Sequence, residues 1–150
     1  MVQLLLGHHA DINAQGGGHG TALQAASKRG HEKIIQLLLA HHADVNAKGG
    51  LFGTALQAAS AGGHEEIVQL LLDYHVDINA QGGLFGTALQ AASRRGHDKI
   101  VQLLLDHHAG INAQGGGYGT GLQAVLEDGH EKIVRLLINN NGENMNASDS

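Results

Sequence analysis

The 150-residue sequence contains no cysteine, no proline and no tryptophan. Without cysteine, the chain cannot form a disulfide scaffold, a thiolate metal site or a cysteine nucleophile. Without proline, its 23 glycines do not belong to a collagen helix. Aromatic residues make up 3% of the chain and charged residues 15%, whereas an average protein has about 25% charged residues. Because 42% of the residues are hydrophobic, the fold must depend on aliphatic packing.

Long apolar runs are also missing. No run approaches the ~20 residues that cross a membrane as a helix. The opening Met-Val-Gln-Leu-Leu-Leu has no basic residue and too short an apolar stretch for a signal peptide. A formal net charge of −5 and a pI near 6.1 disfavour general nucleic-acid binding. We therefore expect a cytoplasmic, intracellular protein that binds neither a membrane nor a nucleic acid.

What the sequence does contain is an internal repeat. The octapeptide Gly-Thr-Ala-Leu-Gln-Ala-Ala-Ser starts at Gly20, Gly53 and Gly86, at intervals of 33 residues, and a degenerate copy starts at Gly119. A Gly-His pair and a Gln-Leu-Leu-Leu run recur with the same period. This arrangement is typical of stacked repeats, in which each unit buries its apolar face against its neighbours.

Each unit is predicted to form a finger loop, a helix, a turn and a second helix. In the copy at 49–81, Thr54 is a good N-cap for a first helix over 55–60. The Gly-His pair at 63–64 forms the turn. The second helix has apolar residues on more than one face at 67–72, so it must pack between neighbours.

Three sets of recurring polar residues are predicted to be structural. A residue suited to left-handed backbone follows each second helix, at His9, His42, His75, His108 and Asn141. The histidines expected to bond to nearby backbone in the turn are His31, His64, His97 and His130. The asparagines expected to form structural bonds at the start of the finger are Asn13, Asn46, Asn79 and Asn112.

Four motifs carry a family resemblance. Ala-Asp-Val-Asn-Ala at 43–47, Thr-x-Leu-x-x-Ala at 54–59, Gly-His at 63–64 and Ile-Val-x-Leu-Leu-Leu at 67–72 resemble the ankyrin repeat, with copies covering residues 1–141. The resemblance implies an all-α ankyrin-repeat solenoid of stacked helix-turn-helix units with short finger loops. In that family the fingers and the exposed ends of the first helices line a concave face that binds proteins.

Two motifs depart from the usual family pattern. The family's Thr-Pro-Leu-His is Thr-Ala-Leu-Gln here, and Gly-Gly-x-aromatic-Gly replaces the Asp-x-x-Gly finger. This variant resembles the ankyrin arrays of fungal NLR-like (STAND) proteins, many of which carry such an array as the sensing region after an ATPase. The resemblance implies that the chain is a fragment of a larger sensor or scaffold.

The repeat pattern predicts six segments. They are a partial repeat at 1–15 (a second helix and the following loop), repeats at 16–48, 49–81 and 82–114, a capping-like repeat at 115–141 and a polar, disordered tail at 142–150. The sequence opens inside a second helix at 2–6, with no polar cap before it. We therefore expect a piece of a longer array, the alternative being a short natural protein with a frayed end.

No catalytic, metal-binding or cofactor-binding residue is predicted. The serines Ser27, Ser60 and Ser93 recur inside first helices, whereas an active site would break a repeat. His-Glu-Lys-Ile-Ile at 31–35 begins like the zinc-binding H-E-x-x-H motif but lacks its second histidine. Histidines one repeat apart are separated by ~8–10 Å and cannot share one zinc ion. No phosphate-binding loop motif occurs. We therefore do not expect an enzyme.

Partner recognition is expected where the copies differ from one another. Such positions follow the first helix, occupy the finger tip or precede the left-handed residue. The candidates are His19, Lys28, Arg29, Leu51, Phe52, Tyr74, Leu84, Phe85, Arg94, Arg95 and Tyr118.

One finger position carries a ring in every copy, at His19, Phe52, Phe85 and Tyr118. Packed-helix spacing predicts a ladder of rings with steps of ~10 Å. The rings either bind a partner or pack on neighbouring fingers. Leu51 and Leu84 are stronger recognition candidates, because glycine replaces them in the outer copies. With basic residues nearby, they favour a partner that has apolar anchors and acidic flanks.

The predicted function is therefore protein–protein interaction through the concave face formed by finger tips and first helices. The alternative is a structural spacer that self-associates end-to-end through its uncapped N-terminal repeat.

Overall fold

The computed structural model describes residues 11–111, 125 and 130–148, with side chains described as far as residue 140. Within these residues it contains seven α-helices and a short 3-10 helix, and no strand. The elements are η1 (Gly17–His19), α2 (Ala22–Arg29), α3 (Glu32–Ala40), α4 (Ala55–Gly62), α5 (Glu65–Asp73), α6 (Ala88–Arg95), α7 (Asp98–Asp106) and α9 (Glu131–Ser148).

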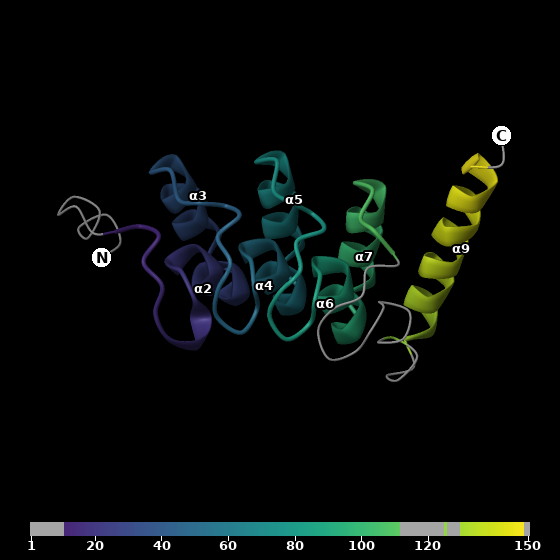
Figure 1. The fold of residues 1–150 in the computed structure, drawn as a ribbon, viewed down its shortest axis with the longest axis horizontal. Helices are drawn as coiled ribbons and strands as arrows, with labels where there is room; N and C mark the ends of the chain where they lie inside the picture. Colours follow the sequence, from purple (N-terminus) through teal and green to yellow (C-terminus); the bar gives the residue numbers. More distant parts are fainter. Residues whose placement is uncertain (1–10, 112–124, 126–129, 149–150) are drawn as a thin grey trace.

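The helices form two parallel rows. Figure 1 shows the first helices of the repeats, α2, α4 and α6, in one row and the second helices, α3, α5 and α7, in the other. Contacts run from α2 to α4 and from α4 to α6 along the first row, and each first helix contacts the second helix of its own pair. Helix α9 follows α7 at the end of the array (Figure 1). The prediction of an all-α solenoid of helix-turn-helix units is confirmed.

A capping box starts each first helix. In α4, the Thr54 hydroxyl accepts a hydrogen bond from the Gln57 backbone N–H, and Gln57 Oε1 accepts one from the Thr54 backbone N–H. The same pair of bonds joins Thr21 to Gln24 and Thr87 to Gln90. These bonds satisfy backbone donors that a helix start leaves unpaired. The predicted N-cap is confirmed.

The second helices end in a left-handed histidine. His42, His75 and His108 have φ angles of 66°, 56° and 66°, as predicted. His9 lies outside the described residues. The assignment of Asn141 to the same role is wrong, because α9 continues through it to Ser148. The sequence predicts a disordered tail at 142–150, whereas the backbone at 142–148 is helical in the structure. This segment contains no proline that would stop the helix.

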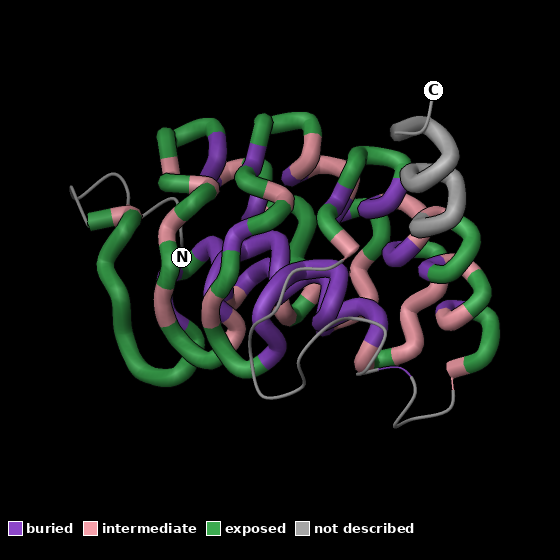
Figure 2. The backbone as a smooth tube through the Cα atoms, turned by 45° about the vertical axis from the view of Figure 1, so that its right-hand side comes forward, coloured by how far each residue is buried: buried purple, intermediate pink, exposed green. Residues whose placement is uncertain are grey.

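Buried side chains lie mainly between successive repeats. Figure 2 shows burial concentrated along the first helices, with exposed turns at both edges of the array. Leu56, Ala58 and Ala59 of α4 are fully buried, and Leu71 of α5 is buried behind them. Small alanines let adjacent first helices approach closely. This packing fixes the positions of the finger loops that precede each first helix.

Candidate partner-binding surface on the finger turns

The tips of the finger loops, called finger turns here, span residues 16–20, 49–53 and 82–86. Each is closed by an antiparallel bridge between its first and last glycine. Neighbouring turns are also bonded to each other: Leu51 N–H donates to Gly18 O at 2.7 Å, and Leu84 N–H donates to Leu51 O at 2.8 Å. The three turns therefore form one continuous hydrogen-bonded row.

Close approach of the turns requires glycine at Gly50. Its φ angle is 64°, a region that favours glycine. A Cβ atom at this position would lie 2.7 Å from Gly18 O and 2.6 Å from Gly20 N. Both are backbone atoms that cannot move aside without separating the turns. The double glycine that opens each finger thus permits the row to form.

A buried glutamine in each of α2 and α4 holds the next finger in place. Besides capping its own helix, Gln24 donates through Nε2 to Ala47 O at 2.8 Å and to Gly53 O at 2.6 Å. Gln57 Nε2 donates in the same way to Ala80 O and Gly86 O. This role of the glutamine was not predicted from the sequence. The available signal was a glutamine three residues after each N-cap threonine, which is the capping-box spacing.

The asparagines and histidines add further bonds between repeats. Asn13 Oδ1 and Asn46 Oδ1 accept hydrogen bonds at 2.8 Å from the backbone N–H groups one repeat later, on Asp44 and Asp77. His64 Nε2 lies 2.9 Å from Lys28 O of the preceding repeat. The prediction of structural bonds is confirmed for these asparagines, and Asn112 lies outside the described part of the chain. His64 bonds to backbone as predicted, but its partner is a carbonyl of the preceding repeat and not of its own turn.

The two described phenylalanines stack on one another. The ring centroids of Phe52 and Phe85 are 6.3 Å apart, with an angle of 16° between the planes. The predicted step of ~10 Å is therefore wrong. It assumed helix-to-helix spacing, whereas the finger turns are bonded directly to each other. Phe85 is only 8% exposed and packs with Ala61 and Ala91, which supports the packing interpretation for this ring.

Two cationic side chains contact this pair of rings. Lys28 Nζ lies 5.3 Å from the centroid of Phe52, and the guanidinium carbon of Arg95 lies 5.3 Å from the centroid of Phe85. Both distances fall within the range of cation–π attraction. The cations are thereby held beside the finger turns.

Leu51 and Leu84 are the exposed apolar residues of the finger turns. Their side chains are 51% and 53% exposed. The Leu51 side chain leans over Gly18 of the preceding turn, where a Cβ atom would lie 3.4 Å from Leu51 Cδ1. This is an ordinary van der Waals distance, so the leucine side chain rests on the preceding turn without a clash.

The structure therefore gathers six of the candidates into one patch. This patch, called the finger surface below, consists of Lys28, Leu51, Phe52, Leu84, Phe85 and Arg95.

The remaining candidates are less tightly grouped. His19 lies in the first finger turn. Arg29 and Arg94 lie in the last turns of α2 and α6, each adjacent in sequence to a member of the patch. Tyr74 is 47% exposed, but it caps the far end of α5. In Figure 1 that end of the helix lies at the edge opposite the finger turns. Tyr118 lies outside the described residues.

The described part of the chain holds no group of three or more histidine, cysteine or acidic side chains placed to bind a metal ion. None of its helices is long and apolar enough to cross a membrane.

The sequence was compared with models of known protein families. A family model described as ankyrin repeats (3 copies) matches residues 1–82 and 79–149. The chain belongs to the ankyrin repeat family. No curated protein matches the sequence. Ankyrin repeats are generally protein–protein interaction modules and typically not enzymes.

Proposed function

We propose that this ankyrin array binds a partner protein through the finger surface and the adjoining ends of the first helices. The observation that carries the proposal is the pair Leu51 and Leu84. Both are about half exposed to solvent on neighbouring finger turns. Exposed aliphatic side chains beside basic groups are typical of a recognition surface.

The mechanism is recognition by a preformed surface. Gln24 and Gln57 bond the finger turns to the first helices, and the turns bond to one another. A surface held in this way loses little conformational entropy when a partner binds. The array then supplies shape and charge, and it needs no cofactor.

The wider setting of the module is also proposed. The resemblance of the Gly-Gly-x-aromatic-Gly fingers to fungal NLR-like arrays supports a role as the recognition part of a larger cytoplasmic sensor or scaffold. Any ATPase activity of such a protein would reside in another domain.

A capture experiment tests the proposal. The bait proteins are the wild type, the double variant Leu51→Ser/Leu84→Ser and the control Ile138→Ser, which changes a comparably exposed residue on α9. We expect a protein captured from a lysate of the source organism by the wild type and the control, and lost with the double variant. Equal capture by all three baits contradicts recognition through the fingers. Far-UV circular dichroism confirms that each bait is folded.

One observation favours the alternative of end-to-end self-association. Ala22 is exposed and Ile34 half-buried on the outward side of α2 and α3, whereas their counterparts Ala55 and Ile67 are buried by the preceding repeat. A second copy could cover this side. Sedimentation equilibrium would then show a mass that rises with concentration and returns to the monomer value in Ile34→Glu.

A further inference from the structure

The spacing along the finger surface matches an extended polypeptide. The ring centroids of Phe52 and Phe85 are 6.3 Å apart, and the turns that carry these rings are directly hydrogen-bonded. In an extended chain, side chains two residues apart lie on the same face and are separated by about 6.6–6.8 Å. Side chains at alternate positions of an extended partner can therefore meet successive fingers in register.

The exposed apolar side chains of the finger turns, Leu51 and Leu84, also form a single narrow row. Each of the two central finger turns exposes one leucine, and the ring beside it is half-buried in Phe52 and buried in Phe85. A helix docks through an apolar stripe about 100° wide, which requires a broader surface. An extended partner presents one row of alternate side chains and needs only a narrow strip of apolar surface. The two exposed leucines therefore favour an extended segment.

Positive charge lies beside the rings of both finger turns. Lys28 is held against Phe52, and Arg95 against Phe85. The three finger turns contain no acidic residue that could neutralise them, and Arg29 adds another exposed cation beside Lys28. Carboxylates of a partner can form charge-assisted hydrogen bonds with these cations.

From these three observations we infer that the partner presents an extended acidic segment. Its pattern is acidic-x-apolar-x-apolar-x-acidic, so that four alternate side chains face Lys28, Leu51, Leu84 and Arg95 in turn. The inference rests on the proposed function and specifies the chemistry that the same surface recognises.

A display experiment with random 12-residue peptides tests the inference without assuming a motif. The folded chain is the target, and retained peptides are sequenced. We expect enrichment of apolar residues at a spacing of two, flanked by aspartate or glutamate. A synthetic peptide Thr-Asp-Thr-Leu-Thr-Leu-Thr-Asp-Thr then serves as the probe for fluorescence anisotropy.

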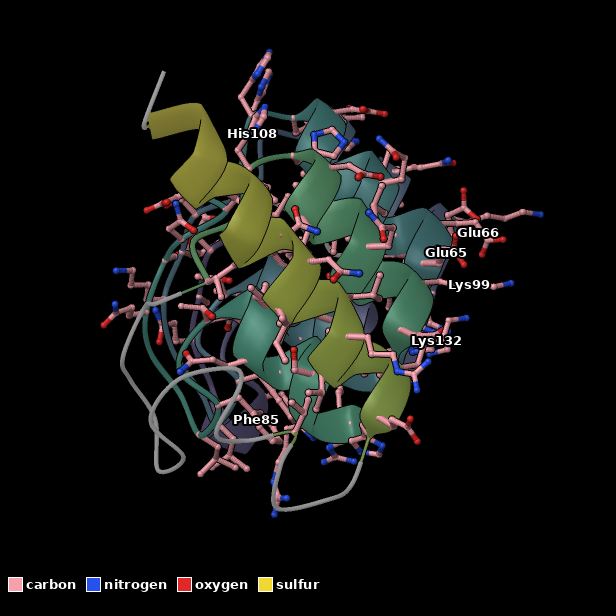
Figure 3. The ribbon with its side chains drawn as sticks, turned by 90° about the vertical axis from the view of Figure 1, so that its right-hand side faces the viewer. Glu65, Glu66, Phe85, Lys99, His108 and Lys132 are labelled. Carbon is pink, nitrogen blue, oxygen red and sulfur yellow. The ribbon has the colours of Figure 1, made fainter. Side chains whose placement is uncertain are left out.

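Matched variants identify the surface used. We expect Leu51→Ser/Leu84→Ser and, separately, Lys28→Glu/Arg95→Glu to weaken binding of this peptide at least tenfold. Lys99→Glu should change it less than twofold. In Figure 3, Lys99 projects on the same side of the array as Glu65, Glu66 and Lys132, away from Phe85. Circular dichroism checks that all variants remain folded.

Several results would overturn the inference. They are a helical spacing of three or four between apolar residues, a motif without acidic flanks, the absence of retained peptides, and equal binding by the finger variants. If lysate capture still depends on Leu51 and Leu84 in any of these cases, the proposed function stands and only the extended acidic segment is wrong.

Discussion

At the scale of single residues, Gln57 joins parts of the chain that are far apart in sequence. Its Oε1 caps α4, and its Nε2 donates to carbonyl groups of the next repeat, all in a buried setting. Gln57→Glu keeps the acceptor but removes the donor and places a carboxylate against carbonyl oxygens. We expect the free energy of unfolding to fall by about 2–4 kcal/mol, because a buried group then lacks its partner.

Urea unfolding followed by circular dichroism measures this loss. The control is Gln36→Glu, the same change at an exposed position of α3. It should lower stability by less than about 0.5 kcal/mol. Equal effects of the two changes would show that the buried glutamine does not join the repeats.

The left-handed histidines allow a second prediction at this scale. His42 has a φ angle of 66°, whereas the adjacent His41 has −97°, and both side chains are exposed. Left-handed backbone costs a non-glycine residue roughly 1 kcal/mol or more, and glycine avoids this cost. Glycine also gives the unfolded chain more conformational freedom, and the loss of this freedom on folding lowers stability by about 0.4–1 kcal/mol.

These opposing effects give the two histidines different outcomes. We expect His42→Gly to leave stability unchanged or to raise it by up to about 1 kcal/mol, and His41→Gly to lower it by about 0.5–1 kcal/mol. Thermal and urea unfolding of both variants provide the comparison. A larger loss for His42→Gly than for His41→Gly would contradict the backbone explanation.

At the scale of elements, the sequence predicts the helices better than the fingers. Thr54, the Gly-His pair at 63–64 and the left-handed His75 are local signals, and each helix boundary depends on them. The closeness of the finger turns is not local, because it depends on bonds such as that from Leu84 N–H to Leu51 O, between residues 33 positions apart. The candidate residues could therefore be identified from the differences between copies of the repeat. The 6.3 Å spacing of the rings could not be predicted in this way.

Helices α7 and α9 are linked by an ion pair that depends on pH. Lys132 Nζ lies 2.7 Å from Asp98 Oδ2, and the two side chains are 75% and 34% exposed. The pKa of the Asp98 carboxyl is lowered from its ordinary value of 3.8, chiefly by the hydrogen bond from Lys132. Burial acts in the opposite direction and raises this pKa. The positive charge of Lys132 and the hydrogen bonds from backbone N–H groups lower it further. A lowered pKa in the folded state means that the pair stabilises the protein above pH ~4 and that this contribution is lost as the pH falls through the folded pKa.

The Lys132→Gln variant tests this link. At pH 7 we expect a loss of about 0.2–1 kcal/mol, because solvent screens a pair this exposed. The difference from wild type should shrink as the pH falls below 4, and also in 1 M salt. The control Lys33→Gln removes an exposed lysine for which the described residues offer no ion pair, and it should show no such pH dependence. A constant difference between Lys132→Gln and wild type from pH 7 to pH 3 would contradict the assignment.

At the scale of the whole molecule, stability depends on position along the array. Helix α4 packs against α2, α5 and α6, whereas α2 packs against α3, α4 and η1. Leu56 of α4 and Leu23 of α2 are equivalent residues, and both are 1% exposed. In a stacked array, stability is approximately a sum of repeat terms and neighbour-interface terms. A cavity at Leu56 therefore weakens the interfaces on both of its sides, and a cavity at Leu23 weakens mainly the first.

Hydrogen exchange resolved by helix distinguishes the two positions. Each change to alanine should cost about 2–5 kcal/mol locally, because it removes a fully buried side chain. We expect Leu56→Ala to speed amide exchange in α2, α4 and α6. In contrast, Leu23→Ala should speed exchange in α2 and α3 and leave α6 and α7 close to wild type. Uniform acceleration in both variants would mean that the array unfolds as one unit, and the finger surface would then lose its shape whenever any single repeat opens.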